Sequence, residues 1–577
     1  MTTPGRTCPN DAPQDLSAGA GGPSLLLQTF LLAGVCGVLF LSNSAALPLS
    51  DPEESRCALI VRQMLAGGDW IVPHLEGEPY FDKPAPFFWL AAAGQVLTGS
   101  AELGGRLIPA LAAMCAVFVA FCFARRLWGD PAGVLAGVIL ATSGEFLFLA
   151  RWYRMDMPFA AAMWAAVWWF WKYDSRRLEG LPVPGRRMWV GFYALAGVAT
   201  LFKGPAGLGL PVIIVGGYLL LSRQGKRLLE LLNPWGLGVY LLIAAPWYLA
   251  VALREPGYAY EFFVRQNLLR YVGGARLGHH WPGILYVPIL LAGMLPWTVY
   301  LPGTVGRLFP WRWRLRAERP AVLLLWPAVL LPLLFFCFSG TKLAGYILPV
   351  FPPLAVLVAG LIAPWIRSHQ DDALMKHGAR AMLGTIVILP LVPIGVEIYL
   401  GAAGAWLAVP ACIALVSAAA MVRSLRLARR GAFVSWAAVA IVGVYLYLIW
   451  HTAPIAYGLM STRHLARSIP QPLAPNAEIC FWDKAESSLL LYAGIGQGER
   501  FRQSDPAALG RLMERLAGDH VVYCLVSGQD LLGKLQSACP VPLHVVAQQQ
   551  DLWLVANRPP HQGAETQPAS GPAAAGP

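Results

Sequence analysis

Long apolar runs dominate the chain, from "SLLLQTFLLAGVCGVLFLSNSAALPL" near its start to "VSWAAVAIVGVYLYLIW", which ends at residue 450. Each run is long enough to cross a hydrocarbon layer of about 30 Å as a helix. Hydrophobic residues make up 56% of the 577 residues, whereas charged residues make up only 13%. The pattern predicts a polytopic α-helical membrane protein and excludes a water-soluble globular protein.

Basic residues collect in alternate loops between these runs and give the chain a formal net charge of +12. Loops of this kind are expected in the cytoplasm, and following their alternation gives about thirteen spans. The basic loops contain Arg125 and Arg126, residues 172–187, 223–227, 307–319, 367–380 and 423–430. The N-terminus is then cytoplasmic and the C-terminus lies outside. Because the surplus positive charge is explained by basic residues in cytoplasmic loops, nucleic acid is not expected as a partner.

One apolar segment, "PFFWLAAAGQVLTGS" at 86–100, does not fit this alternation as a span. Counting it as a crossing would invert every later basic loop, and it is short for a crossing. We therefore expect a helix at the outer interface, inside one large outer loop at 47–104. The aromatic side chains in this region are expected to anchor that interface: Tyr80, Phe81, Phe87, Phe88 and Trp89.

After residue 455 the pattern changes to short β-like runs such as "AEICFW" and "HVVYCLV", separated by helical patterns such as "DPAALGRLMERLAG". This change predicts a small extracytoplasmic α/β domain, in which one disulfide is possible among Cys480, Cys524 and Cys539. The expected organisation is a disordered cytoplasmic tail at 1–23, a transmembrane domain at 24–455, the soluble domain at 456–560 and a disordered tail at 561–577.

Charges on the outer side are fewer and stand in short sets beside span ends. Ionisable groups near an apolar layer usually line a wet cavity, so chemistry is expected on this side. The first set is "DPEESR" at 51–56. It has a purely structural alternative, because Asp51 as N-cap, Pro52 in the first turn and Glu54 as capping acid would start a helix. The apolar stripe of that helix would contain Cys57, Ile60, Val61, Met64 and Leu65.

The same outer loop continues with "RQML", "GDWIVP", "YFDKP" and "FFWL". Together these motifs resemble the bacterial lipid A 4-amino-4-deoxy-L-arabinose transferases, within the GT-C class of membrane glycosyltransferases that also includes protein O-mannosyltransferases. Later segments follow in the family's order: "ARWYRMDMPF", "LFKGPAGLGLP", "FFVRQNLLRY" and "SGTKLAGYILPVFPP". The resemblance covers roughly residues 25–365 and implies a GT-C bundle of about thirteen transmembrane helices with a large first extracytoplasmic loop.

The resemblance also implies a catalytic carboxylate in the first loop. The family usually has Asp-Pro-Asp-Glu there, and Glu53 stands at the position of the second aspartate. Asp51 is the fallback candidate. Asp156 is a second carboxylate that could face Glu53 across a cavity, although it could also form only an ion pair that caps its helix.

Sugar transfer from a polyprenyl phosphate needs cations for the departing phosphate, a carboxylate near the reacting centre and a pocket for the lipid. Lys83 is the first choice for the phosphate, because "YFDKP" places it beside the acidic loop. Its alternative role is that of an interfacial lysine. The expected substrate- and phosphate-binding residues are Arg56, Tyr80, Asp82, Lys83, Arg154, Lys203, Arg265, Arg270, Lys342 and Tyr346. The sequence contains no zinc-type spacing, Walker, Rossmann or HExxH motif, so no cofactor or structural metal is expected. A requirement for a divalent metal is left open, and metal independence is favoured because no cluster of ligands stands out.

The sequence thus predicts an integral membrane glycosyltransferase of the bacterial inner membrane. It would transfer a sugar from undecaprenyl or another polyprenyl phosphate to lipid A or a related glycolipid on the periplasmic face. Transfer to protein or to another envelope glycan is the nearest alternative, and a secondary transporter or an assembly protein is the alternative from another class. Glu53 would act as a general base only if the acceptor is a hydroxyl, because a phosphate acceptor is already ionised.

Overall fold

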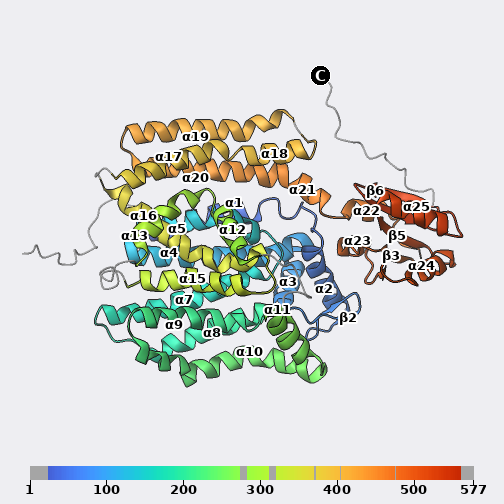
Figure 1. Ribbon diagram of the computed structural model, residues 1–577, viewed down its shortest axis with the longest axis horizontal. Coiled ribbons are helices and arrows are strands. Elements are labelled where there is room, and N and C mark those ends of the chain that lie inside the picture. Colours follow the sequence, from blue (N-terminus) through green and yellow to red (C-terminus); the bar gives the residue numbers. More distant parts are fainter. Residues whose placement is uncertain are drawn as a thin grey trace, which may run out of the picture.

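The computed structural model describes residues 24–272, 282–310, 320–368, 372–402, 404–474 and 476–559. Figure 1 shows a large block of helices lying side by side, with a smaller unit that contains a sheet at one end. The two predicted tails, 1–23 and 561–577, lie outside the described residues.

Long apolar helices form the block. Six described helices or continuous helix pairs are long and apolar enough to cross a membrane, and two bent pairs bring the number to eight. The six are Ala101–Trp128, Pro234–Arg254, Ala344–Arg367, Ala373–Tyr399, Ala405–Arg426 and Arg430–Leu459. Many of their leucine and valine side chains face outward, as expected for surfaces that contact lipid. This is the architecture of a multi-pass membrane protein.

Helix α4 (Ala101–Trp128) is at the centre of the block and packs against α3 (Pro86–Thr98), α5 (Asp130–Ala141), α7 (Asp156–Leu178) and α16 (Phe351–Arg367). It begins at Ser100, whose hydroxyl accepts a hydrogen bond from the amide of Leu103. Its contact with α7 includes Phe123 stacked on Trp164, with ring centroids 5.3 Å apart. Apolar packing of this kind holds the helices in fixed positions relative to one another.

Helix α2 (Glu53–Gly67) forms where the first loop predicted a helix, and Gly68 ends it at a φ of 75°, which suits glycine. Two details of the prediction are wrong. The Asp51 side chain does not cap α2, because its carboxylate accepts hydrogen bonds from the Ser55 and Ser488 side chains instead. Leu65 is 41% exposed, so it does not continue the buried stripe.

The loop continues through a two-stranded hairpin, β1 (His74–Leu75) and β2 (Glu78–Pro79), to α3. Phe87 and Phe88 at the start of α3 are fully buried, and the Phe87 ring lies 5.9 Å from that of Tyr153. The expectation that these two rings anchor a membrane interface is therefore wrong. They attach α3 to the protein interior because α2, α4 and the turn at Tyr153 cover them.

The smaller unit contains a five-stranded mixed sheet of order β4-β3-β5-β7-β6. Its strands are β3 (Glu478–Trp482), β4 (Glu499–Phe501), β5 (Val522–Ser527), β6 (His544–Gln549) and β7 (Leu552–Ala556). Strands β4, β3 and β5 are parallel, whereas β7 is antiparallel to both β5 and β6. Cys480 and Cys524 are register partners on β3 and β5, and both are free thiols, as is Cys539. The disulfide considered possible from sequence is thus not formed among these three cysteines.

Candidate active site

A buried ion pair fixes the acidic loop in front of α2. Glu54 and Arg106 are 0% and 1% exposed, and the Arg106 Nη2 to Glu54 Oε2 distance is 2.7 Å. Arg106 also donates to the carbonyls of Ser44 and Leu47, and Glu54 accepts the amide of Tyr153. Since both charges are compensated by several hydrogen bonds, the pair can remain ionised inside the protein. It joins the acidic loop, α4 and the turn before α7.

Next to this pair, Arg154 lies between the two carboxylates that the sequence singled out. Its Nε atom is 3.1 Å from Asp156 Oδ2 and 3.7 Å from Glu53 Oε2. Asp156 also forms an ion pair with Lys203, at the end of α8 (Gly185–Lys203). The Asp156 side chain is only 3% exposed, whereas that of Glu53 is 35% exposed. Two cations therefore hold Asp156 inside the protein, and Glu53 keeps access to solvent.

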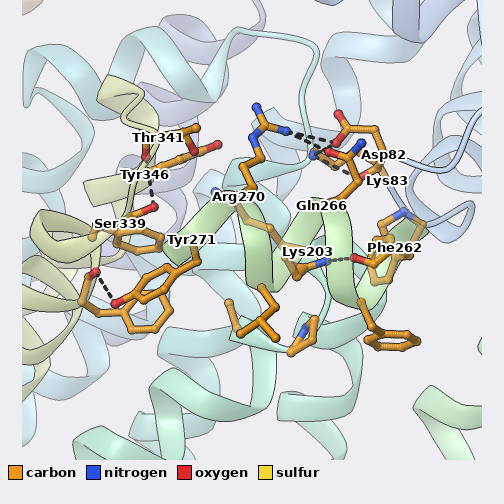
Figure 2. Close-up of a pocket in the computed structure, with 18 residues that line it drawn as sticks. Asp82, Lys83, Lys203, Phe262, Gln266, Arg270, Tyr271, Ser339, Thr341 and Tyr346 are labelled. Atoms are coloured by element: carbon orange, nitrogen blue, oxygen red, sulfur yellow. Dashed lines mark hydrogen bonds and ion pairs between the residues drawn. The ribbon is translucent and has the colours of Figure 1, made fainter. Parts of the chain in front are cut away.

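Lys203 leads into a cavity of about 500 Å³. The cavity lies between the segment after β2, the end of α8, the helices η2 (Tyr260–Leu269) and α11 (Arg270–Val272), and the end of α15 (Val322–Phe338) (Figure 2). Three cations line it together with one acid: Lys83, Lys203, Arg270 and Asp82. Four phenylalanines form apolar walls: Phe262, Phe263, Phe335 and Phe336. A cationic opening with apolar walls suits an anionic head group attached to a hydrocarbon chain.

Asp82 organises the cations at one side of the cavity. Its Oδ1 atom is 3.1 Å from Lys83 Nζ and 3.3 Å from Arg270 Nη1 (Figure 2). Burial alone would raise the pKa of Asp82, but Lys83 and Arg270 outweigh burial and hold this pKa below its ordinary value. Asp82 is therefore ionised at neutral pH and positions both cations while leaving the lining with a net positive charge.

The structure brings most of the sequence-predicted residues together. Five of them line the cavity: Asp82, Lys83, Lys203, Arg270 and Tyr346. Tyr346 lies against Lys203, whose Nζ atom is 4.5 Å from the centre of its ring. Beside the cavity, Arg56 interacts with Tyr80 and Glu53, and Arg154 with Glu53 and Asp156.

Three further predicted residues neither line this cavity nor belong to the group around Arg154. Arg265 is largely exposed and pairs with Glu261 on its own helix, with Nη1 and Oε2 3.0 Å apart. Lys342 is buried and donates to the carbonyl of Ser339 at 2.6 Å. Asp51 lines a different cavity, next to the sheet-containing unit. The structure places these three residues outside the lining of the cavity beside Lys203, and their contact with a ligand phosphate or sugar stays a prediction.

Sequence reasoning missed two parts of this region. Gln266, Asn267 and Tyr271 line the cavity, and the first two belong to η2, which has the wide π-type turn often found at functional sites. Arg106 was also missed, although an arginine inside an apolar helix needs a buried partner and could have indicated Glu54.

Two solved membrane-protein structures have a similar fold. The crystal structure of ArnT from Cupriavidus metallidurans bound to undecaprenyl phosphate superposes with a TM-score of 0.75 at 23% identity, over 93% of this chain and 99% of that chain. The apo oligosaccharyltransferase of Archaeoglobus fulgidus gives a TM-score of 0.50 at 11% identity, over 87% of this chain and 69% of that one.

The sequence relatives are more specific, and they confirm the resemblance carried by the first loop. The chain is 34% identical to each of two undecaprenyl phosphate-alpha-4-amino-4-deoxy-L-arabinose arabinosyl transferases of Pseudomonas fluorescens. These matches cover 59% and 64% of this chain but only 58% and 64% of the relatives' own lengths. Residues 82–249 also match the family described as dolichyl-phosphate-mannose-protein mannosyltransferase.

Proposed function

We propose that the protein is a glycosyltransferase that moves a sugar from a polyprenyl phosphate to an envelope acceptor, most concretely lipid A or a related glycolipid. The observation that carries this proposal is the cavity in which three cations meet apolar walls, next to the carboxylates around Arg154. The relatives named as undecaprenyl phosphate aminoarabinose transferases, and the similar structure bound to undecaprenyl phosphate, support the same donor class.

In the proposed reaction, the bond between the anomeric carbon and the donor phosphate oxygen breaks, and the acceptor oxygen bonds to that carbon. The departing polyprenyl phosphate gains negative charge on its phosphate. Lys83 and Arg270 would stabilise that charge, Arg270 through its planar donors and Lys83 as a point charge. The phenylalanine walls would hold the isoprenoid chain.

Glu53 is the carboxylate that we assign to the reacting centre. Asp156 is compensated by Lys203 and Arg154, so its proposed role is to position these cations. If the acceptor is a hydroxyl, Glu53 takes its proton during attack. If the acceptor is a phosphate, no proton has to be removed, and Glu53 would orient the substrates. The relatives' usual aspartate is shorter by one methylene, so the acceptor position would shift accordingly.

The topology belongs to the same proposal. We propose about thirteen spans, with a cytoplasmic N-terminus and the cavity, the 47–104 loop and the 456–560 domain on the periplasmic side of the inner membrane. The basic loops support this orientation. Arg125 and Arg126, for example, lie in the last turn of α4, at the opposite end from Ser100 and the first loop.

Transfer to a protein hydroxyl is the second candidate function. It is favoured by the match of residues 82–249 to the protein mannosyltransferase family. With this acceptor, Glu53 would have to act as a base, and the product would be a glycoprotein.

Mass spectrometry of envelope lipids and glycoproteins, with and without the protein, distinguishes these functions. We expect one sugar-bearing species to disappear without the protein, and also in Glu53→Gln and Lys83→Ala. Each variant should lose roughly 100-fold or more of the transfer activity. Glu514→Gln and Lys534→Ala change exposed residues of the C-terminal unit and serve as matched controls. Normal products in both site variants at normal expression would refute the assignment, and solute movement across sealed vesicles without sugar transfer would indicate a transporter.

A further inference from the structure

Helix α2 is covered on two sides by different parts of the protein. Cys57, Ile60 and Val61 belong to the core of the helical block. Leu59, which is 0% exposed, instead belongs to an apolar cluster of the C-terminal unit and packs there with Leu489 and Leu490. The helix that begins at Glu53 is therefore shared between the two units.

The contact is made by α23 (Ser487–Ala493), which lies at the edge of the C-terminal unit that faces α2 (Figure 1). Arg62 on α2 donates to the carbonyl of Leu491 at 2.8 Å and to that of Ile495. These carbonyls lie at or just beyond the C-terminal end of α23, where a cation is favourable. The bonds fix one end of α23 to the middle of α2.

The other end of α23 is fixed to Asp51. The amide of Ser488 donates to Asp51 Oδ1 at 2.9 Å, and the Ser488 hydroxyl donates to Oδ2. The Asp51 amide in turn donates to the carbonyl of Met460 at 2.8 Å, in the segment that leads into the C-terminal unit. The carboxylate and the backbone amide of Asp51 are thus both bonded to residues near the C-terminal unit. Asp51 lies two residues before Glu53.

We propose that α23, by holding the Asp51 carboxylate through Ser488, fixes the position of Glu53 beside Arg154. Asp51 and Ser488 are then positioning residues rather than catalytic ones. This inference rests on the proposed function, because it assumes that Glu53 takes part in sugar transfer. It gives the C-terminal unit a role in that reaction without requiring any contact between this unit and a substrate.

The surroundings of Asp51 agree with a positioning role. It lines a cavity of about 600 Å³ between the loop and the C-terminal unit, which Lys484, Glu486 and Asp551 also line. Lys484, the cation among these lining residues, pairs with Glu486 at 2.5 Å. The Ser488 and Ser55 donors are what holds the carboxylate.

The test uses the full-length protein in nanodiscs, with undecaprenyl phosphate-linked aminoarabinose as donor and lipid A as acceptor. Asp51→Ala and Ser488→Ala should each lower kcat about tenfold, with little change in the KM for the donor, because the loop and not the cavity is disturbed. The losses in the double variant should be less than additive, since both single variants remove the hydrogen bond from the Ser488 hydroxyl to the Asp51 carboxylate. Asp51→Asn keeps an acceptor oxygen and should retain most of the activity. Ser537→Ala, on the exposed side of the same unit, is the matched control.

Hydrogen exchange provides a readout that does not depend on turnover. In Asp51→Ala and Ser488→Ala, the amides of 49–56 and 487–495 should exchange faster, while those of α4 stay unchanged. If Asp51→Asn is as inactive as Glu53→Gln, Asp51 takes part in the chemistry and the proposal is wrong. If the wild type transfers no sugar, the proposed function fails on its own. Unchanged hydrogen exchange in both alanine variants would refute the positioning role of the Asp51–Ser488 contact, whether or not the wild type transfers sugar.

Discussion

Glu53 and Glu54 are neighbours in sequence with opposite environments. The Glu54 side chain is fully buried against Arg106, whereas that of Glu53 is 35% exposed and contacts Arg154 at the longer distance of 3.7 Å. Because successive residues of a helix point in different directions, the first turn of α2 places one carboxylate in the core and the next on the surface. One acid holds the loop, and its neighbour keeps access to solvent beside Arg154.

The buried pair leads to a prediction about stability. Arg106→Gln leaves the Glu54 carboxylate without its charged partner and should lower the unfolding free energy by about 3 to 5 kcal/mol. Arg511→Gln, which breaks an exposed pair with Asp505, should change it by less than about 1 kcal/mol. Thermal unfolding in nanodiscs measures both variants. An Arg106→Gln protein as stable as the wild type would show that the pair does not hold the loop.

Asp51 should make stability depend on pH. Burial raises the pKa of Asp51 to about 6, nearby Glu486 adds to the rise, and hydrogen bonds from Ser488 and Ser55 oppose it. The folded protein therefore favours the protonated acid, so its unfolding free energy falls as the pH rises from about 4 to 6 and stays lower above that. This change is at most about 3 kcal/mol. Between pH 4.5 and pH 7, the melting temperature of Asp51→Asn should fall less than that of the wild type. An equal fall in the two proteins would contradict the prediction.

At the scale of helices, α3 is a short apolar helix whose two ends lie in different surroundings. Phe87 and Phe88 are fully buried, while Leu97 on the last turn is 81% exposed. The helix has 13 residues and ends at Gly99, where φ is 65°. It is too short to cross the hydrocarbon layer alone, and its buried end lies against the first loop.

The two ends of α3 should respond differently to truncation. Phe87→Ala opens a cavity in the core and should lower stability by about 3 to 5 kcal/mol. Leu97→Ala removes a similarly apolar side chain from an exposed position and should have a much smaller effect. Thermal melting of the two variants in the same nanodisc lipid makes the comparison. Equal losses would mean that lipid contact, and not burial, stabilises this helix.

The sequence predicted α2, α3 and four of the five sheet strands, all but β4, because local periodicity and glycine positions determine them. It also indicated the first-loop motif, since those residues lie within a few turns of each other. It did not predict Gln266 or Tyr271 in the cavity, because the neighbours of η2 come from α8 and α15. The Asp51 contact was equally hidden, since Ser488 is 437 residues away. Short-range patterns carry no information about which distant segment satisfies a buried charge.

At the scale of the whole molecule, the charges beside the cavity come from distant segments that must share one side of the membrane. Arg154 contacts both Glu53 and Asp156, and Asp156 forms an ion pair with Lys203. The C-terminal unit is attached to the same loop through α23. Any topology that separates these segments is therefore incompatible with the structure.

Cysteine labelling tests the proposed orientation. In a cysteine-free background, a cysteine at the exposed Asp519 should react with a membrane-impermeant maleimide in intact spheroplasts. A cysteine at the exposed Lys226, in the short helix η1 (Gly225–Leu232) before α10 (Pro234–Arg254), should react only after permeabilisation. Labelling of both positions from outside, or of neither, would contradict the periplasmic placement of the C-terminal unit.

The shared burial of Leu59 has a consequence for biogenesis. The ribosome makes α2 long before α23 exists, so one apolar side of α2 stays uncovered until the last segments of the chain have been made. Chains that stop early would keep this surface open, and quality-control proteases would have a signal that distinguishes incomplete copies from finished ones.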